Sequence, residues 1–125
     1  MTVLDRLTGG KYLLVTTFRK DGTPVPTPVW VVRDGDAPAV WTPAVSGKVK
    51  RIRRDPQVEV APCDFKGKPD GPPVTGRAEI LDAAGSARVR ALVRRRFGVT
   101  GWLVVTGSLL RRGRHGTVGI RITVD

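Results

Sequence analysis

The sequence has almost none of the residues that build metal centres and catalytic triads. Its 125 residues include one cysteine, Cys63, and one histidine, His115. A lone cysteine excludes an intrachain disulfide and agrees with a reducing compartment. The two residues together are too few for a tetrahedral zinc site in one chain. A Ser-His-Asp site would need His115, which lies in the basic turn RRGRHG and is better interpreted as an exposed turn residue. We therefore expect no catalytic side chain and no metal site.

Long apolar runs are also missing. No stretch approaches the roughly 18 apolar residues that a membrane helix needs. The first ten residues, MTVLDRLTGG, lack the basic-then-apolar pattern of a signal peptide. The length fits a single domain over residues 1–125. These features predict a soluble, cytoplasmic protein without a membrane partner.

Acidic residues are scarce beside basic ones. The 22 Lys and Arg residues outnumber 11 Asp and Glu residues, which gives a formal net charge of +11. Such a charge attracts nucleic acids, acidic membranes or anionic small molecules, although drift towards arginine in the composition would also produce it. Aromatic residues make up only 6% of the chain, too few to interleave with basic residues as base-stacking platforms. A nucleic-acid partner is therefore disfavoured.

Short β-branched and aromatic segments separated by turns predict a mainly antiparallel β protein. Gly76, in the expected strand 74–81, is interpreted as a bulge. Short strands at hairpin spacing favour a closed barrel over a βαβ sheet. The expected strands cover residues 11–19, 23–33, 39–42, 57–63, 74–81, 101–110 and 116–124.

Proline recurs at every second position of the second expected strand, at Pro24, Pro26 and Pro28. Proline has no N–H group to donate to a neighbouring strand. We therefore expect the first half of this strand to have an unpaired edge. That edge either receives a ligand or another chain, or it is a protected edge that faces solvent.

Two helices are expected, over residues 46–54 and 86–97. In the first, Ser46 is a suitable N-cap, and the Asp55-Pro56 pair ends the helix. In the second, apolar side chains fall on one face and arginines on the other, and Gly98 is a suitable stop. Trp30 and Trp41 are expected to pack in the core or to frame a flat ring.

The first expected helix carries the strongest local signal, WTPAVSGKVKRIRRDP. A helix start offers free N–H groups and a partial positive charge, and Ser46 and Lys48 beside it would suit a phosphate group. The spacing is not that of a Walker A loop, because Val49 follows Gly47-Lys48. A solvated basic helix with no ligand is the alternative.

Three stretches resemble the F420-dependent branch of the flavin/deazaflavin oxidoreductase superfamily, a group related to pyridoxamine phosphate oxidases (PPOX class). They are KYLLVTTFRKDGTPVPTPVWVV, WTPAVSGKVKRIRRDPQVEVAPCD and GRAEIL, and SGKVKRIRRDP is the most specific piece. The resemblance implies an FMN-binding-type split β-barrel. Its expected form has six to seven antiparallel strands in Greek-key order, two short helices and a homodimeric assembly.

The resemblance also implies a cofactor in a groove between two subunits. The residues it assigns to the cofactor's phosphate and tail lie on the basic segment SGKVKRIRRDP, and those along the ring or bordering its groove lie on two strands. Those from the other subunit lie at the end of the Gly/Pro loop, residues 64–73, and directly after it. The phosphate and tail residues are Ser46, Lys48, Lys50 and Arg51. The ring and groove residues are Thr27, Pro28, Val29, Trp41 and Thr42, and those from the other subunit are Pro72, Pro73 and Val74.

The implied activity is hydride transfer between reduced coenzyme F420 and an unidentified small organic substrate. The phosphodiester and polyglutamate tail of this deazaflavin suit a chain of charge +11. Hydride transfer from a cofactor ring requires no protein nucleophile, which agrees with the absence of one. Because related split barrels use FMN, FAD or haem, an FMN-binding oxidoreductase or a cofactor carrier is the alternative.

Overall fold

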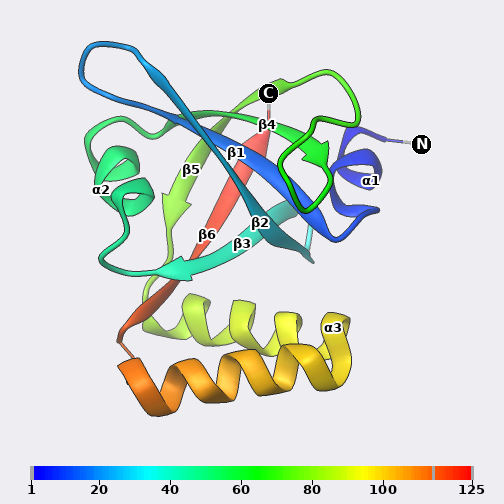
Figure 1. Cartoon of the computed structure of the whole chain (residues 1–125), viewed down its shortest axis with the longest axis vertical. Helices are drawn as coiled ribbons and strands as arrows, with labels where there is room; N and C mark the ends of the chain where they lie inside the picture. Colours follow the sequence, from blue (N-terminus) through cyan, green and yellow to red (C-terminus); the bar gives the residue numbers. More distant parts are fainter. Residues whose placement is uncertain (1, 114, 125) are drawn as a thin grey trace.

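A six-stranded antiparallel barrel with three helices forms the part of the chain that the computed structural model describes, residues 2–113 and 115–124 (Figure 1). Around the barrel the strands follow the order β1-β2-β3-β6-β5-β4. The helices are α1 (Val3–Thr8), α2 (Gly47–Arg54) and α3 (Ala83–Arg112). The strands are β1 (Tyr12–Phe18), β2 (Pro24–Asp34), β3 (Ala37–Pro43), β4 (Gln57–Cys63), β5 (Val74–Ile80) and β6 (Thr117–Val124). The expected mainly β split barrel is confirmed.

Alternate strand residues fill the barrel interior. Leu13 and Val15 of β1 are fully buried, and the residues between them face outward, as the period of a strand requires. Leu7 of α1 and two residues of α2, Val49 and Ile52, belong to the same apolar cluster. Figure 1 shows these two helices at opposite ends of the barrel. Burying each such side chain stabilises the fold by about 1.5–3 kcal/mol.

The strand β2 changes neighbours half-way along its length. Its residues 24–30 pair with β1, whereas its pairing with β3 covers only residues 31–34. The expectation that the proline-rich half has one unpaired edge is therefore confirmed. Because prolines cannot donate, this half pairs on one side only, and the barrel is split here.

The segment 101–110 is helical, so the strand expected there is wrong. Its buried residues Gly101, Val105 and Ser108 are four and three positions apart, which is the spacing of one helix face. The apolar run and its β-branched residues favoured a strand, and a short apolar run does not distinguish the two structures. The basic turn therefore connects a helix to β6 rather than two strands; Arg114 in it lies outside the described residues.

Gly98 divides α3 into two helical segments. Its φ of 59° and ψ of −134° are non-helical, and only glycine adopts such a conformation readily. The expected stop at Gly98 is confirmed, but a second helical segment follows it directly. The expectation of two short helices is therefore wrong, because α3 spans 30 residues and α1 was not expected. The sequence does signal α1, through a capping box in which Thr2 and Asp5 bond each other's backbone.

Gly76 is not a bulge. The register of β5 is continuous through it against both β4 and β6. A Cβ atom at this position would lie 3.0 Å from Ile122 Cγ2 and 3.0 Å from the Thr123 carbonyl oxygen. Glycine is therefore required for close strand packing, which local sequence patterns do not distinguish from a bulge.

The helix α3 packs outside the barrel over β2, β3 and β6. A second apolar cluster joins Val89, Val93 and Val105 to the strands, with Trp30 and Trp41 beside it. Both tryptophans thus pack in the interface beneath α3, and the Trp30 ring stacks on Phe97 at 4.3 Å. Among the described residues, no helix combines the length and the apolar character needed to cross a membrane.

Candidate anion-binding site

The helix α2 starts at one end of the barrel, as its sequence predicts. Ser46 is the N-cap, and its hydroxyl accepts a hydrogen bond from the Val49 N–H at 3.4 Å. Val49 and Ile52 turn into the core, so the polar face of the helix is directed outward. The first turn holds no acidic residue, so its partial positive charge is not neutralised within the helix.

Lys48 is buried at the start of this helix, with 7% of its surface exposed. Its ammonium group donates a long hydrogen bond of 3.4 Å to Thr42 Oγ1, and no carboxylate pairs with it among the described ion pairs. Burial, and then the nearby positive charge of Arg51, lower the pKa of Lys48. A buried cation without an anionic partner costs stability, so an anion from outside the chain would stabilise it.

Arg51 lies one turn further along α2 and folds back towards the helix start. Its Nε donates a 2.6 Å hydrogen bond to Thr17 Oγ1, on the inner side of β1. A Cβ atom at Gly47 would lie 2.8 Å from a terminal nitrogen of Arg51. Gly47 therefore leaves the space that the guanidinium occupies, and two long cationic side chains are held beside the same helix terminus.

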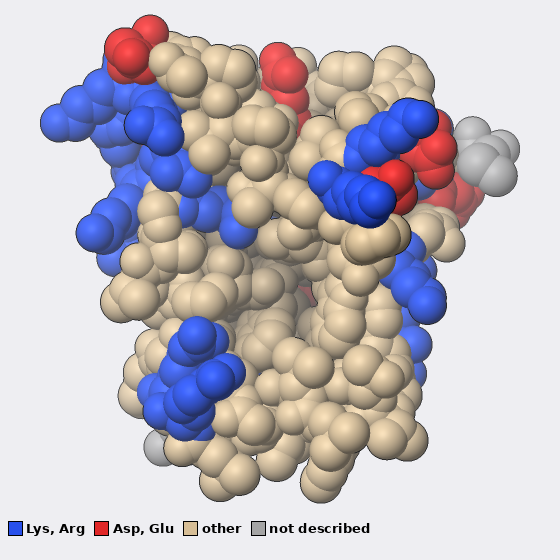
Figure 2. Space-filling view, in the orientation of Figure 1, with Lys and Arg blue, Asp and Glu red and all other residues tan. Residues whose placement is uncertain are grey.

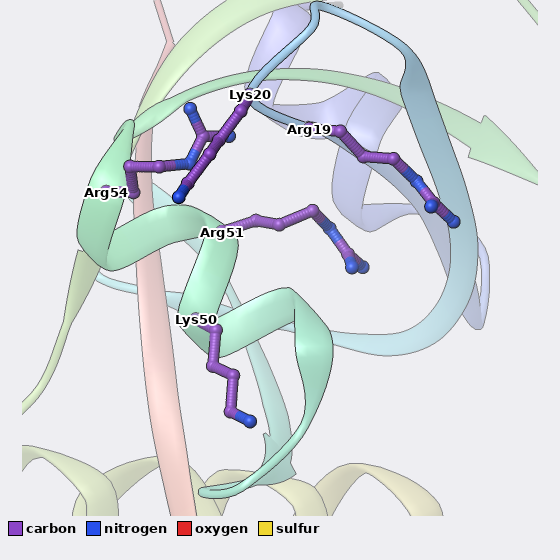
Figure 3. A pocket seen from close by; sticks show the side chains of 5 residues that line it. All are labelled: Arg19, Lys20, Lys50, Arg51 and Arg54. Atoms are coloured by element: carbon purple, nitrogen blue, oxygen red, sulfur yellow. The ribbon is translucent and has the colours of Figure 1, made fainter.

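Five cationic side chains line an open pocket of about 380 Å³, which we call the basic pocket. Two come from the β1–β2 hairpin and three from α2 (Figure 3). Arg54 also donates to the carbonyl oxygen of Phe18, which ties the end of α2 to the hairpin. The five residues are Arg19, Lys20, Lys50, Arg51 and Arg54.

No ion pair of the described residues joins a carboxylate to the basic pocket, and Asp21 on the hairpin is near enough to Arg19 for their charges to interact. Within the described residues, every ion pair involves Asp5, Asp34 or Asp36, and their arginine partners lie outside the pocket. Figure 2 shows Lys and Arg gathered on the side of the molecule where Figure 1 places α2 and the β1–β2 hairpin. Because like charges concentrated in a concave surface reinforce each other's field, this face attracts anions.

The unpaired edge of β2 begins beside the basic pocket, since Thr17, the partner of Arg51, pairs with Val25. The N–H and C=O of one strand residue point to the same side of the strand. Pro24, Pro26 and Pro28 lack the N–H, so their positions offer only carbonyl oxygens along this edge. Thr27 pairs with Val15, whose side chain is fully buried in the barrel, and within the described chain the buried Thr27 hydroxyl has no hydrogen-bond partner.

A smaller apolar pocket of about 150 Å³ lies on the outer face of β1 and β4. The Gly/Pro loop forms its rim, because Pro69 and Pro73 line it together with Leu14 and Ala61. Arg6 holds the same loop through a 3.0 Å hydrogen bond to the Pro72 carbonyl oxygen. Val74 begins β5 directly after the loop.

The structure brings five of the twelve expected site residues together at one end of the barrel. Ser46, Lys48, Lys50, Arg51 and Thr42 gather at the start of α2. Of the expected ring and loop residues, Pro73 alone lines the apolar pocket, and Pro28 pairs with Leu14, which also lines it. Trp41 lies apart from both, because it packs beneath α3, where its buried Nε1 has no hydrogen-bond partner among the described residues.

Sequence reasoning missed Arg19, Lys20 and Arg54 as members of the site. The residues before Asp21-Gly22 signalled only a turn, and Arg54 was one of several exposed helix charges. Which cations share a pocket depends on the packing of the β1–β2 hairpin against α2. The sequence signal that could have suggested it is the Arg-Lys pair at the hairpin tip.

Residues 2–125 match the family model of pyridoxamine 5'-phosphate oxidase. The chain belongs to this family. It has the split-barrel fold that flavin-binding oxidoreductases of the family use. No curated protein matches the chain.

Several solved structures share the fold. Protein Rv2991 of Mycobacterium tuberculosis superposes with a TM-score of 0.75 at 23% identity, over 99% of this chain and 81% of that one. An F420 reductase gives a TM-score of 0.67 at 21% identity, over 100% and 95%. HutZ, a haem storage protein from Vibrio cholerae, gives 0.69 at 16% identity, over 92% and 82%. At these identities the likeness shows the fold alone.

Proposed function

We propose that this member of the pyridoxamine 5'-phosphate oxidase family binds coenzyme F420 and transfers a hydride between the reduced cofactor and a small organic substrate. The cofactor would lie in a groove at the interface of a homodimer. The cation cluster at the start of α2 supports this most directly. Five cations that form no ion pair with the described carboxylates line the basic pocket, and the buried Lys48 lies on the same helix.

The residues present fit an anionic cofactor. Among the residues that the structure describes, the buried ammonium of Lys48 has one weak neutral partner, Thr42, and the first turn of α2 carries no acidic side chain. A phosphodiester would meet Ser46, Lys48 and Arg51 there, because charge-assisted hydrogen bonds are stronger than those between neutral groups. Lys50 and the hairpin cations Arg19 and Lys20 would then take a chain of carboxylates. A ligand with several negative charges therefore fits better than one with a single phosphate.

The open edge of β2 fits the ring of such a cofactor. Carbonyl oxygens at Pro26 and Pro28 accept from ring N–H groups but repel carbonyls. Thr27 and Val29 belong to the same stretch of strand, and Pro72, Pro73 and Val74 would close the groove from the second subunit. Trp41 would border this groove only after a movement of α3, because it packs beneath this helix.

When bound, the cofactor supplies the hydride chemistry itself. The protein's own residues would bind the phosphate and tail, orient the ring along β2 and exclude water from the face where the substrate lies. No protein nucleophile is needed for this reaction class. The small-molecule substrate would be chosen by the loops around the apolar pocket.

An FMN-binding oxidoreductase or cofactor carrier is the second candidate. The family name and fold favour FMN as much as F420, and the phosphate of FMN would also satisfy Lys48 and Arg51. A haem protein fits less well, since haem iron takes His, Cys, Met or Tyr as axial ligand. None of these residue types lines the basic pocket. Cys63 is buried, and exposed His115 lies after α3, outside the pocket.

A fluorescence titration with oxidised F420, and with FMN in parallel, tests the cofactor. Arg51→Ala removes both a positive charge of the pocket and the hydrogen bond to Thr17. Lys50→Ala is therefore included, because Lys50 is an exposed cation of the same pocket and its loss tests the charge alone. Arg53→Ala is the matched control, since Arg53 is an exposed cation on the same helix that does not line the pocket.

We expect saturable F420 binding that weakens roughly 10-fold or more in Lys50→Ala and Arg51→Ala, since a bond to a charged group contributes about 1.5–3 kcal/mol. Arg53→Ala should change the affinity little. Preference for FMN would keep the site but change the cofactor. Equal loss in all three variants would indicate a general charge effect instead. Binding of neither cofactor would refute the proposed function, and nucleic acid would be tested next.

A further inference from the structure

The second segment of α3 exposes an apolar stripe that nothing in the described chain covers. Eight large hydrophobic side chains are exposed among the described residues, and five of them lie between Val99 and Leu110. The outward line is formed by Val99, Trp102, Leu103 and Leu110, which are 76%, 55%, 58% and 84% exposed. Trp102 and Leu103 follow Val99 by three and four positions, and Leu110 follows them by eight and seven, which is the spacing of one helix face. The opposite face, with Gly101, Val105 and Ser108, is buried.

The charges around this stripe are all positive. Between Ala83 and Arg112 the sequence has seven arginines and no Asp or Glu. No charged residue falls within 98–110, and the exposed Arg95, Arg111 and Arg112 flank this range. Figure 2 shows the lower part of the molecule, where Figure 1 places α3, as an uncharged surface with a cluster of Lys and Arg at one side.

This charge pattern distinguishes two occupants. If two copies paired antiparallel through the stripe, Arg111 and Arg112 of one chain would approach the Arg95 end of the other with no acidic residue of α3 between them. Like charges brought together across an interface destabilise such a pair. An anionic lipid surface provides the opposite charge to both ends of the stripe. It also accepts tryptophan and leucine at the boundary between headgroups and acyl chains.

We propose that the segment 99–112 of α3 docks on an anionic lipid surface. Trp102, Leu103 and Leu110 enter the headgroup boundary, and Arg111 and Arg112 meet lipid phosphates. The sequence predicted no membrane partner because it has no spanning segment, but a helix that lies on a surface needs none. The unpaired β2 edge, where a second subunit is proposed, belongs to the other half of that strand from the one that pairs with β3.

Co-flotation of the full chain with vesicles tests this surface. One set of vesicles is phosphatidylcholine, and the other contains phosphatidylglycerol at about one third of the lipid. The variant Trp102→Ser/Leu103→Ser removes two exposed apolar side chains. Phe65→Ser is the control, an aromatic residue of the Gly/Pro loop that is 65% exposed. Arg111→Gln/Arg112→Gln removes charge and leaves the stripe intact.

We expect the parent to float with the anionic vesicles, and the Trp102/Leu103 variant to lose on the order of ten-fold or more of this binding. The Arg111/Arg112 variant should lose roughly 30-fold, at about 1 kcal/mol for each arginine. Phe65→Ser should bind like the parent. Three results would overturn the proposal: no binding to anionic vesicles, equal binding in the stripe variant, or a light-scattering mass that falls from dimer to monomer in the stripe variant. The last would show that a second copy covers the stripe.

Discussion

Replacing Lys48 by methionine should stabilise the free protein while it weakens anion binding. Methionine has nearly the volume and flexibility of lysine, so the packing at the end of the barrel changes little. In the parent, the ammonium is 7% exposed and has one hydrogen bond of 3.4 Å, to Thr42. A side chain selected for folding alone would not carry a charge in this position.

The magnitude follows from two opposing terms. Removing a buried ion relieves a desolvation penalty of several kcal/mol. It also removes a hydrogen bond that would contribute at most about 1.5 kcal/mol at this length and leaves Thr42 without its donor. The net gain is about 1–2 kcal/mol, which in a domain of 125 residues raises Tm by about 4–8 °C. Anion affinity should fall roughly 10- to 100-fold, because a charged contact is lost.

The pH dependence identifies the cause. Burial and Arg51 lower the pKa of Lys48 in the folded protein below its value in the unfolded chain. The cost of burying the charge is therefore full below the folded pKa, and it disappears as pH rises from the folded pKa to the unfolded one. The stability difference between Lys48→Met and the parent should be largest near neutral pH and should shrink as pH rises.

Urea unfolding of both proteins, from neutral pH to about pH 10, measures this difference. The same titration of Arg53→Met controls for the loss of one positive charge from α2, because Arg53 is exposed. A lower stability of Lys48→Met at neutral pH would refute the reasoning, and so would a gain that does not depend on pH. Either result would mean that Lys48 stabilises this end of the barrel in the free protein rather than serving to bind an anion.

Three further predictions concern the fold. Gly98→Ala should destabilise the protein by about 1–3 kcal/mol through its backbone conformation alone, since the space around Gly98 is open. Gly107→Ala in the same helix should stabilise it by about 0.5–1 kcal/mol. Urea unfolding compares the two variants, and equal effects on stability would contradict the break at Gly98. Gly76→Ala should destabilise by about 1–3 kcal/mol because its Cβ would meet Ile122 at 3.0 Å, and an unchanged Tm would argue against this close packing. Burial, with Asp64 and Asp70 nearby, raises the pKa of Cys63; a thiol reagent at about pH 8 should therefore react slowly with the native protein and quickly after unfolding, and rapid reaction of the native protein would contradict this.

Much of the barrel could be predicted because its signals are local. Six strands show β-branched periodicity between turn residues, and one of them, 57–63, has the expected bounds. The N-cap at Ser46 and the stop before Pro56 define α2 within a few residues of sequence. The alternate prolines predicted the open edge of β2, because a missing N–H acts on the residue that lacks it.

The segment 101–110 shows where local information ends. Its apolar run fits either a strand or a helix, and the choice depends on packing against the first segment of α3. A Cβ atom at Gly101 would lie 2.6 Å from the Val93 carbonyl oxygen, so the two segments approach as closely as glycine allows. The hydrophobic periodicity of a sequence does not report contacts of this kind between two segments.

The candidate site divides in the same way. The sequence by itself determined that a basic helix with a free N-terminus follows a strand, since capping and charge are properties of neighbouring residues. Only the tertiary structure brought Arg19 and Lys20 of the hairpin beside Lys50 and Arg51, and only the tertiary structure buried Lys48. Burial and the convergence of charges depend on how the barrel closes, and closure is set by strand pairs far apart in the chain, such as β1 with β4 and β3 with β6.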